Sequence, residues 1–562
     1  MHILLLDPFP FFDFAHPELR PEHRPKHSLG HQVTTIRLAG FETPLGDILA
    51  TLNSPPDCIV QMETLGKRHF VSGLEKAPCP TVFFSFDTHL NLFWQRHYAK
   101  LFDATATPHV SWFENLPKED SVNRVFRLPH VGNIRPWRPH GARQHPLGFC
   151  GRRTIERPLR AWMLDLLEQE TPIVIRDGIP FDDMMEFYGD TRAVSNEAIC
   201  FEVNCRLFEA ASAGAVPLTP DCGPDQEAVF ALGAEMLVYK GGLDLLDKAR
   251  WLAANPEKAE RIGRAAWERV QREHLPVHRA KTLLETLPGL SQARATGNDA
   301  ALRLWLAYVE RMKTGDMGYP LSHLLSQSET LPETAEMLAG LLNLLALPAR
   351  REEALAVCRA LLEQNLFPSS GICNATASAA ALLHGDFPLA RQFWLRFCEH
   401  TPELPSAASD NAVHDTPFSL CLAWAENEKR EGRSVRPGFS FSSAKALLPA
   451  CAFEFLTFAE EMGTRKKNNA SASATDAKLT LLENFPPYIP YRLRLLQERK
   501  AREPHWESLL EASALSLRCC LVAQGAGLLA EAAESAAAAN EEQAFRAALA
   551  ASPAREYSLR NN

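Results

Sequence analysis

The sequence predicts two α/β lobes followed by an all-α half, and three observations support this fold class. Residues 1 to about 285 alternate short apolar runs with helical stretches, the pattern of parallel α/β domains. Prolines crowd residues 128–139, where neither a helix interior nor a central strand accepts them, so we expect a linker between the lobes there. Beyond about residue 290, strand signals end and Leu and Ala recur at helical spacing. The expected domains are 1–140, 141–287 and 288–562.

The composition limits what kind of protein this is. The chain has 562 residues, 46% hydrophobic and 23% charged, as in folded chains generally, which excludes wholesale disorder. Its formal net charge of -9 disfavours general nucleic-acid binding, because phosphate contacts need a basic surface. No apolar run approaches the roughly 20 residues that cross a bilayer. The apolar start of the chain stops at Asp7, too short for a signal peptide, so a cytoplasmic protein without a membrane span is expected.

The 13 cysteines are scattered and include no C-x-x-C pair. Cys519 and Cys520 are adjacent, a spacing that suits neither an unstrained disulfide nor a usual zinc site. We therefore expect free thiols, mostly buried, in a reducing compartment.

Four apolar runs predict the strands of the first lobe, at residues 3–6, 33–36, 58–61 and 81–86, and residues 92–102 have helical spacing. Asp87 and His89 follow the last of these strands, so they should lie at its end facing the cleft. Gln61 and Glu63 end the preceding strand and could line the same wall. A histidine whose ordinary pKa is near 6.5 suits proton transfer, although His89 could equally be a satisfied structural residue.

The second lobe is predicted from a similar alternation. Expected strands are 146–151, 172–176, 193–196, 215–218 and 237–239, and expected helices are 155–168, 204–213 and one starting at 255–257. Gly214 suits a left-handed helix end that lets the next strand begin at once. Two such lobes joined by a hinge form a cleft, and ligands of parallel sheets bind at the carboxyl ends of the strands.

The helical half carries a weak internal repeat. Residues 334–347 with 352–364, and 375–384 with 388–400, predict two helix–turn–helix units about 35 residues apart, close to the tetratricopeptide period. Residues 541–553 resemble one further second helix. A plain helical bundle is the alternative. Residues 464–478 are polar and low in complexity, and we expect them to form a loop or a disordered insert.

The most informative stretch is residues 204–218, a helix with a polar start that ends at Gly214 and leads into a buried strand. A carboxylate such as that of Glu209, near the start of this helix, faces a cleft and has two acceptor oxygens suited to ribose hydroxyls. The alternative interpretation is that Glu209 is an ordinary acidic residue near a helix N-terminus.

This stretch resembles the signature of the CgeB-like (spore-maturation-type) group 1 glycosyltransferases. That pattern is an Asn-x-Arg-x-Phe-Glu-Ala run, a small-x-Gly helix end and a short apolar strand, as in residues 204–218. Further similar pieces follow in order through half of the chain: 86–89, 97–103, 148–151 with Arg157, 253–257, 273–274 and 278–279.

The resemblance implies a GT-B fold, with two Rossmann-like lobes and a nucleotide-sugar donor held mainly by the second. It implies donor-binding roles for six residues: Glu209 on the ribose, Gly151 where the backbone meets the diphosphate, Arg152 or Arg157 as the positive charge for the leaving group, and Asn204 and Arg206 on the diphosphate or sugar. The sequence does not show which of Arg152 and Arg157 supplies the positive charge for the leaving group. Arg206 could instead form an ion pair within its own helix.

On the acceptor side, the resemblance assigns the catalytic roles to Asp87 and His89. His274 and Arg279 belong to the family tail, and we interpret them as pinning the last helix across both lobes. The sequence departs from the family pattern at two places, and both affect which functional roles can be carried over from the family. Phe201 stands where related enzymes often carry an earlier acid, with Glu202 one residue away, and residues 7–12 replace the usual glycine-rich turn.

The functional prediction is a cytoplasmic bacterial glycosyltransferase that uses a nucleotide-diphosphate sugar, with retention implied by the resemblance. No strand-ended Asp-x-Asp occurs, so we expect neither an obligatory metal nor another cofactor; Asp182 and Asp183 read as helix-start acids. Because paired helices make concave surfaces, the helical half is expected to bind a protein acceptor or partner. The alternative is a non-catalytic scaffold with a degenerate transferase lobe.

Overall fold

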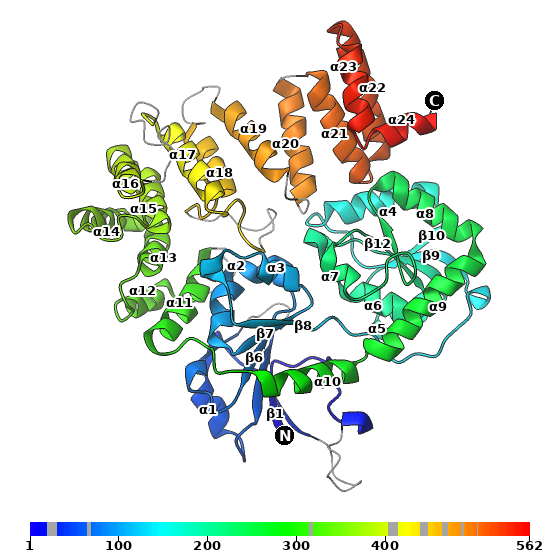
Figure 1. Cartoon of the computed structure of the whole chain (residues 1–562), viewed down its shortest axis with the longest axis horizontal. Coiled ribbons are helices and arrows are strands. Elements are labelled where there is room, and N and C mark those ends of the chain that lie inside the picture. The colour runs from blue at the N-terminus through cyan, green and yellow to red at the C-terminus, as the bar shows by residue number, and fades with distance from the viewer. Residues whose placement is uncertain are drawn as a thin grey trace.

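The computed structural model describes residues 1–19, 31–63, 69–313, 319–402, 414–438, 448–463, 470–483, 485, 488–502 and 504–561. Two α/β lobes lie side by side, and the helical half arches over both of them (Figure 1). Short 3-10 helices interrupt the chain at η1 (Pro17–Leu19), η2 (Leu74–Lys76), η3 (Ala99–Leu101), η4 (Lys118–Asp120), η5 (His140–Ala142), η6 (Ile199–Phe201), η7 (Leu287–Gly289) and η8 (Pro348–Arg350).

A six-stranded, all-parallel sheet forms the first lobe, in the order β2-β1-β4-β6-β7-β8. Its strands are β1 (His2–Leu6), β2 (Gln32–Ile36), β4 (Cys58–Met62), β6 (Thr81–Phe84), β7 (Ala104–Thr107) and β8 (Arg124–Arg127). The four predicted strands are confirmed, with β6 ending two residues early. The sequence did not signal β7 or β8, because β7 alternates Ala and Thr and Arg flanks β8 at both ends.

Helices and a two-stranded parallel sheet complete this lobe. They are α1 (Leu45–Ala50), α2 (Thr88–Tyr98), α3 (Val110–Glu114), β3 (Glu42–Pro44) and β5 (Phe70–Ser72). Helix α2 is buried along nearly its whole length, including the polar residues His89, Asn91 and Gln95. A helix buried on all sides must have neighbours on every face.

The second lobe is a five-stranded parallel sheet in the order β10-β9-β11-β12-β13. Its strands are β9 (His145–Cys150), β10 (Ile173–Arg176), β11 (Thr191–Ser195), β12 (Val216–Pro220) and β13 (Leu237–Tyr239). Its helices are α4 (Pro158–Glu170), α5 (Phe181–Gly189), α6 (Cys205–Ser212), α7 (Pro224–Glu227), α8 (Gly242–Ala254) and α9 (Pro256–Glu273). The predicted helix at 155–168 begins three residues later, because Pro158 takes the first helical position. Asp182 and Asp183 lie in the first turn of α5, as predicted.

Gly214 ends helix α6 as predicted. Its φ is +73°, and the Ala215 amide donates to the Ala210 carbonyl while the Gly214 amide donates to Ala211, which is the Schellman pattern. A Cβ at Gly214 would lie 2.7 Å from an Arg143 nitrogen, so the linker packs directly on this turn. Glycine is therefore required here for both backbone conformation and space.

Helix α10 (Pro276–Thr286) crosses back from the second lobe to the first (Figure 1). Arg279 donates to the carbonyls of Pro129 and His130 in the linker, at 2.7 and 2.8 Å. A nitrogen of the His274 ring lies 2.9 Å from the Val229 carbonyl. The interpretation of these two residues as pins of the last helix is confirmed.

The helical half contains fourteen helices in the part of the chain that the structure describes. They are α11 (Gly297–Lys313), α12 (Leu321–Ser328), α13 (Ala335–Leu345), α14 (Arg351–Glu363), α15 (Gly371–Leu383), α16 (Phe387–Glu399), α17 (Pro417–Arg430), α18 (Ala452–Gly463), α19 (Ala470–Leu482), α20 (Ile489–Arg502), α21 (Trp506–Arg518), α22 (Val522–Ala538), α23 (Glu542–Ala551) and α24 (Arg555–Asn561).

The predicted helix–turn–helix units are present as α13 with α14 and α15 with α16, and the predicted helix at 541–553 is α23. Their tetratricopeptide character stays a prediction. The loop prediction for 464–478 is wrong over residues 470–478, which belong to α19. Alanine and threonine, read as low complexity, pack there as helix residues: Ala474 and Thr475 are buried. Residues 464–469 lie outside the described part.

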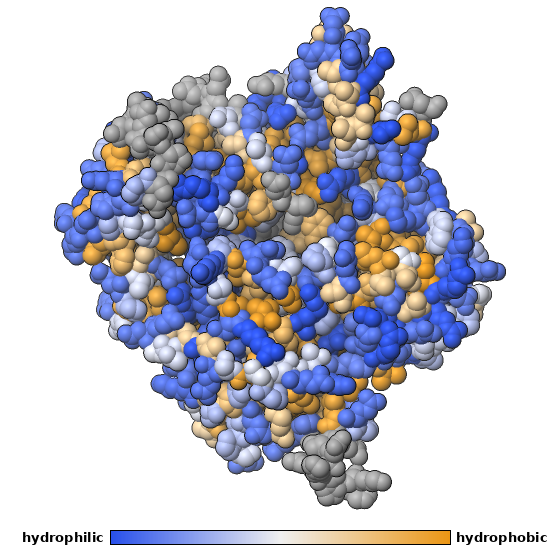
Figure 2. Space-filling view, viewed as in Figure 1, coloured by the Kyte–Doolittle hydropathy of each residue, from blue (hydrophilic) through white to orange (hydrophobic). Residues whose placement is uncertain are grey.

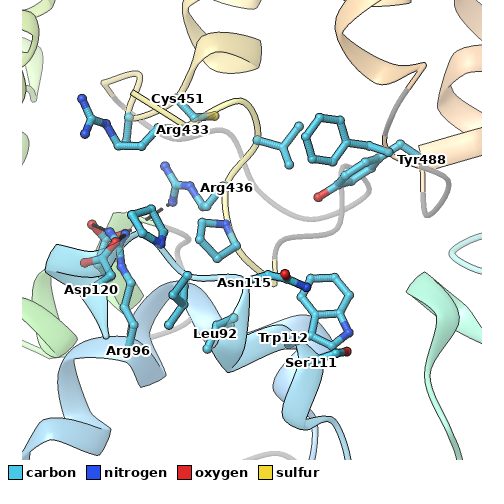
Figure 3. Close-up of a pocket in the computed structure, with 18 residues that line it drawn as sticks. Leu92, Arg96, Ser111, Trp112, Asn115, Asp120, Arg433, Arg436, Cys451 and Tyr488 are labelled. Atoms are coloured by element: carbon cyan, nitrogen blue, oxygen red, sulfur yellow. Dashed lines mark hydrogen bonds and ion pairs between the residues drawn. The ribbon is translucent and has the colours of Figure 1, made fainter. Parts of the chain in front are cut away.

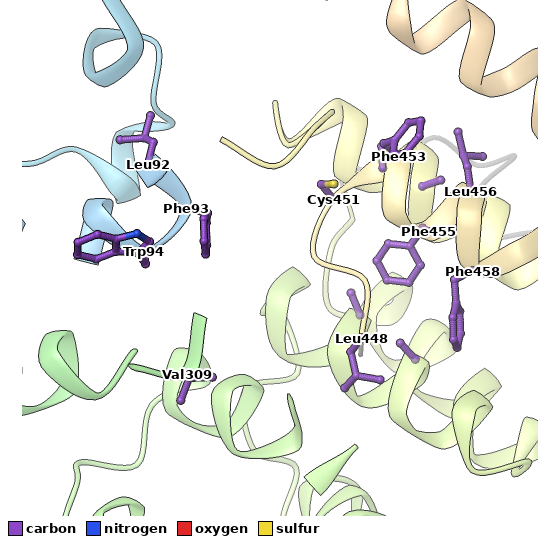
Figure 4. Close-up of a cluster of buried hydrophobic side chains, with 14 of the residues drawn as sticks. Leu92, Phe93, Trp94, Val309, Leu448, Cys451, Phe453, Phe455, Leu456 and Phe458 are labelled. Atoms are coloured by element: carbon purple, nitrogen blue, oxygen red, sulfur yellow. The ribbon is translucent and has the colours of Figure 1, made fainter. Parts of the chain in front are cut away.

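A single hydrophobic core joins the first lobe to the helical half. Trp94 and Tyr98 on α2 belong to the same buried cluster as Trp305 and Tyr308 on α11, and the cluster continues to Phe455 on α18 (Figure 4). The Tyr308 ring lies 4.6 Å from Phe70, and its hydroxyl donates to Glu42 at 2.6 Å. The helical half therefore shares its hydrophobic core with the first lobe.

All thirteen cysteines are free thiols, as predicted. Burial raises the pKa of most of them, for example that of Cys79 to about 11. None of the described helices is both long and apolar enough to span a membrane.

Replacing Trp94 by Ala should destabilise the protein by roughly 3–5 kcal/mol, because a fully buried indole leaves a cavity in the shared core. Hydrogen exchange should show α2 and α11 losing protection together. The control is Trp251→Ala on α8, where the indole is half-buried and the loss should be smaller. Unchanged protection of α11 in Trp94→Ala would show that the two parts fold independently.

Candidate functional site

Three chain segments carry the candidate residues, and His89 of the first meets Glu202 of the third between the lobes. The turn from β6 into α2 carries Asp87 and His89, the turn from β9 into α4 carries Gly151, Arg152 and Arg157, and η6 with α6 carries residues 202–209. Each follows the carboxyl end of a parallel strand, where such sheets bind their ligands.

A buried ion pair links the lobes. Nε2 of His89, from the first lobe, lies 3.2 Å from a carboxylate oxygen of Glu202, from the second. His89 is 1% exposed and Glu202 is 7% exposed. Positive φ angles at Cys200 (48°) and Phe201 (58°) turn the chain just before Glu202. The acid one residue beyond the expected position therefore faces His89 of the first lobe.

The pair sets the protonation of both groups. Burial opposes the charged imidazole, but the Glu202 carboxylate and its hydrogen bond outweigh burial and raise the pKa of His89. Burial likewise opposes the Glu202 carboxylate, but His89 and Arg157 hold its pKa well below its usual range. The interface thus favours a protonated His89 beside an ionised Glu202.

Two further buried histidines surround this pair, and sequence reasoning did not find them. His109 Nε2 accepts a hydrogen bond from the Val203 amide at 3.0 Å, and its ring centre lies 5.2 Å from that of His89. His130 Nδ1 lies 3.4 Å from Cys205 Sγ. Burial lowers the pKa of His109 well below its usual value and that of His130 to about 3, so both are neutral.

Glu63 supports the Asp87 turn. One of its oxygens accepts from the backbone amides of Phe86 and Asp87 at 2.8 and 2.9 Å, and the other accepts from the Asn91 side chain at 2.8 Å. Asp87 begins α2 and is half-buried. Glu63 therefore positions the turn rather than facing a ligand. Gln61, from the same strand, accepts from the Tyr98 hydroxyl at 2.7 Å inside the lobe.

Arg206 is occupied by the interior of the second lobe. It donates to the Cys150 carbonyl at 3.1 Å and to Asn196 Oδ1 at 2.8 Å, and its guanidinium lies 4.5 Å from the centre of the Phe149 ring. A Cβ on Gly151, whose φ is +147°, would lie 3.0 Å from an Arg206 nitrogen. Arg206 therefore fixes the turn after β9, and the positive φ together with this close approach favours glycine there.

The structure separates the two arginines between which the sequence could not choose. Arg152 is 78% exposed and lies 4.0 Å from Asp177 at the surface. Arg157, immediately before α4, lies 3.4 Å from Glu197 and 3.5 Å from Glu202. Arg157 is thus the arginine at the lobe interface.

Asn204 orders the loop that precedes α6. Its amide nitrogen donates to Asn196 Oδ1 and to the Glu197 carbonyl, both at 3.1 Å. Its Oδ1 is buried without a hydrogen-bond partner among the described residues. Such an acceptor at a cleft suits a donor group on a ligand.

Glu209 has a carboxylate that the described part of this lobe leaves without a hydrogen-bond partner. It is half-buried on α6, and no hydrogen bond joins its side chain to the described residues. Burial raises its pKa, and the charge of Arg206 opposes that rise. A carboxylate that the protein leaves unsatisfied suits hydroxyl donors of a ligand.

Asp87, His89 and Glu202 also offer ligand atoms within 4.8 Å of one another. One nitrogen and two carboxylate oxygens are donors that a divalent cation accepts. The ion pair of His89 with Glu202 already accounts for two of these three groups.

Asp225 makes a second contact between the lobes. It accepts from the Ser111 hydroxyl and from Arg127, both at 2.5 Å. The sequence contained no signal for this contact, nor for His109 and His130, because each is defined by a neighbour from the other lobe about 70 to 115 positions away.

A protein-family comparison matches residues 140–285 to the family described as "Glycosyl transferase-like". The match covers the second lobe and α10, and it includes all six predicted donor-binding residues. This segment therefore has the sequence character of a glycosyltransferase lobe. No curated protein matches the chain.

Several solved structures are similar in chain path. Anabaena Alr3699/HepE in complex with UDP shares 11% identity over 52% of this chain and 100% of its own, with a TM-score of 0.37. Sucrose-phosphate synthase from Thermosynechococcus elongatus shares 12% identity over 51% and 98%, with a TM-score of 0.35. The pneumococcal O-GlcNAc transferase GtfA, with UDP and GlcNAc, shares 10% identity over 44% of this chain, with a TM-score of 0.32, and the match spans 59% of its length.

Lowering the pH from about 6.5 to 5 should lower the stability of the protein. Burial lowers the pKa of His130 and His274 to about 3. The unfolded chain therefore takes up protons that the folded chain does not, at a cost of about 1.4 kcal/mol per pH unit for each histidine. The midpoint of urea unfolding, measured at several pH values, reports this loss of stability. The midpoint should fall less steeply with falling pH in His274→Gln, whereas the exposed control His505→Gln should behave as the wild type does. A wild-type midpoint that does not change with pH would contradict the prediction.

Replacing Glu202 by Gln should lower the pKa of His89 below its ordinary value of about 6.5, because burial then acts without the carboxylate. A titration of the histidine ring signals by NMR measures this. In the control Glu197→Gln, which alters a carboxylate paired with arginines, the pKa of His89 should stay raised. A raised pKa in both variants would show that Glu202 does not set the charge.

Proposed function

We propose that the protein is a glycosyltransferase that moves a sugar from a nucleotide-diphosphate sugar to an acceptor. The observation that carries the proposal is Glu209, a half-buried carboxylate on α6 without a hydrogen-bond partner among the described residues, in a segment matched by a glycosyltransferase-like family. Two carboxylate oxygens suit the neighbouring hydroxyls of a ribose.

The diphosphate is proposed to lie between Gly151 and the start of α4. A glycine at this turn lets the backbone approach a phosphate, and a thirteen-residue helix presents its free amides and positive dipole end there. Arg157, next to that helix end, supplies a permanent positive charge for the leaving nucleoside diphosphate. Arg206 contacts the same turn from the interior of the lobe and holds it in position, so it is a positioning residue.

His89 adds a second positive charge at the lobe interface. Held protonated by Glu202, it stabilises negative charge that develops on the diphosphate as the bond to the sugar breaks. Asp87, two residues before His89 in the chain, orients an acceptor hydroxyl in this proposal. We further propose transfer with retention of configuration and without a metal, since arginine, imidazolium and helix end supply the charge.

The acceptor is proposed to be a protein that the helical half helps to bind. The support is architectural: the arch of helices faces both lobes (Figure 1), so a bound partner lies next to the cleft.

Donor binding is the direct test. In a thermal-shift panel of UDP, GDP, TDP and CMP ligands with EDTA present, one nucleotide should raise the melting temperature. The shift should be lost in Glu209→Gln and kept in Glu257→Gln, the same change at an exposed site on α9. One hydrogen-bonded carboxylate contributes about 1.5–3 kcal/mol, or roughly tenfold or more in affinity.

Failure of every nucleotide to shift the wild type would overturn the proposal and favour the non-catalytic scaffold. A shift that appears only without EDTA would place a cation at Asp87, His89 and Glu202.

A further inference from the structure

Two cavities lie where the helical half meets the lobes. The first, of about 320 Å³, is lined by α2 and α3 of the first lobe and by residues 432–437 and 450–451 of the helical half (Figure 3). The second, of about 470 Å³, is lined by the start of α4 and η6 of the second lobe and by α20 and α22. In the space-filling view, the molecule is hollowed where the arch faces the lobes (Figure 2).

Tyr488, just before α20, lines both cavities. The two cavities therefore adjoin at one side chain, on the inner side of the helical half, one against the first lobe and the other against the second. We call the two cavities together the crevice.

The second cavity reaches the candidate site, and the first lies one helical turn from it. Leu92 lines the first cavity one turn beyond His89 on the same helix, about 4.5 Å along the axis. A Cβ at Gly438 would lie 2.5 Å from the Leu92 amide, so the helical half packs directly on the first turns of α2. Arg157 and Glu197 line the second cavity themselves.

The lining selects among ligands. Most of the lining residues are aliphatic or aromatic, and the uncharged polar side chains include Ser111 and Asn115 in the first cavity and Gln497 and Gln524 in the second. Of the charged residues that line the first cavity, Arg96, Asp120, Glu310 and Arg436 pair with one another (Figure 3), and Arg433 pairs with Glu428. In the second cavity, Arg157 pairs with Glu197, and the exposed side chains of Glu156 and Arg494 lie at the rim. A saccharide would leave many hydroxyls without partners on such a surface, whereas apolar side chains gain by burial there.

We propose that the crevice binds the acceptor as an extended, mainly apolar polypeptide segment, with the modified residue at the lobe interface. The scattered amides and hydroxyls then serve the peptide backbone, and the apolar lining takes the side chains on either side. The inference rests on the proposed function for the reaction, and the crevice itself is defined by the two cavities.

The test uses the full chain and a labelled pool of synthetic dodecapeptides, each with Ser, Thr, Asn or Tyr between Leu, Val and Phe residues. Fluorescence anisotropy should show binding to the wild type. Asn115→Trp, which fills the first cavity, and Gln497→Trp and Gln524→Trp, which fill the second, should weaken binding roughly tenfold or more.

Each variant has a matched control on the same helix, at a neighbouring exposed position that does not line a cavity: Glu114→Trp, Glu498→Trp and Ala523→Trp. These should bind peptide as the wild type does. Melting temperatures confirm that all six variants are folded.

Absence of peptide binding to the wild type, or equal binding by cavity variants and controls, would overturn the inference. So would binding to the crevice of a labelled oligosaccharide pool or of phospholipid vesicles in place of the peptides. The nucleotide shift is recorded separately: peptide binding without any nucleotide shift would leave the crevice as a peptide site and refute the transferase.

Discussion

The burial of helix α2 on every side is the constraint on which the rest of the structure depends. Its inner face covers the first sheet, its outer face packs on α11 through the shared core, and its first turn meets η6 of the second lobe through His89 and Glu202. Three parts of the chain therefore meet at eleven residues. Movement of any one part displaces the turn that carries Asp87.

Charges reinforce this junction from the outer side. Arg96 on α2 pairs with Asp120 at 2.5 Å, and Glu310 on α11 lies 3.6 Å from Arg436, which itself pairs with Glu454 on α18 at 2.8 Å. Buried pairs of this kind add little net stability, because desolvation offsets their attraction, but breaking one of them is costly. They hold the helical half in one position over α2, next to the cavity that they line.

The residues singled out in the second lobe divide into two kinds of role. The side chains of Glu209 and Arg157 are only half-buried, so a ligand can reach them. By contrast, Arg206 hydrogen-bonds to the turn after β9, and the side-chain amide of Asn204 hydrogen-bonds to the loop before α6. Residues 204–218 and the turn after β9 thus contain both the groups proposed to bind and the groups that shape the backbone for them. The two kinds are indistinguishable in the sequence, because both need the same polar residue types.

The sequence by itself determined the parallel α/β pattern, the linker, the helix end at Gly214 and most helices of the second half, because these follow from local periodicity, proline and glycine. It also placed Asp87 and His89 at a strand end and Glu209 on the helix that precedes a buried strand. Only the tertiary structure decided that Arg157 rather than Arg152 pairs with Glu202, that Glu202 pairs with His89, and that His109 and His130 join them. Each of these contacts depends on a partner from another lobe or turn. Contacts between distant segments produce no periodic pattern in the sequence. The same reason hides the crevice, whose walls come from three separate parts of the fold.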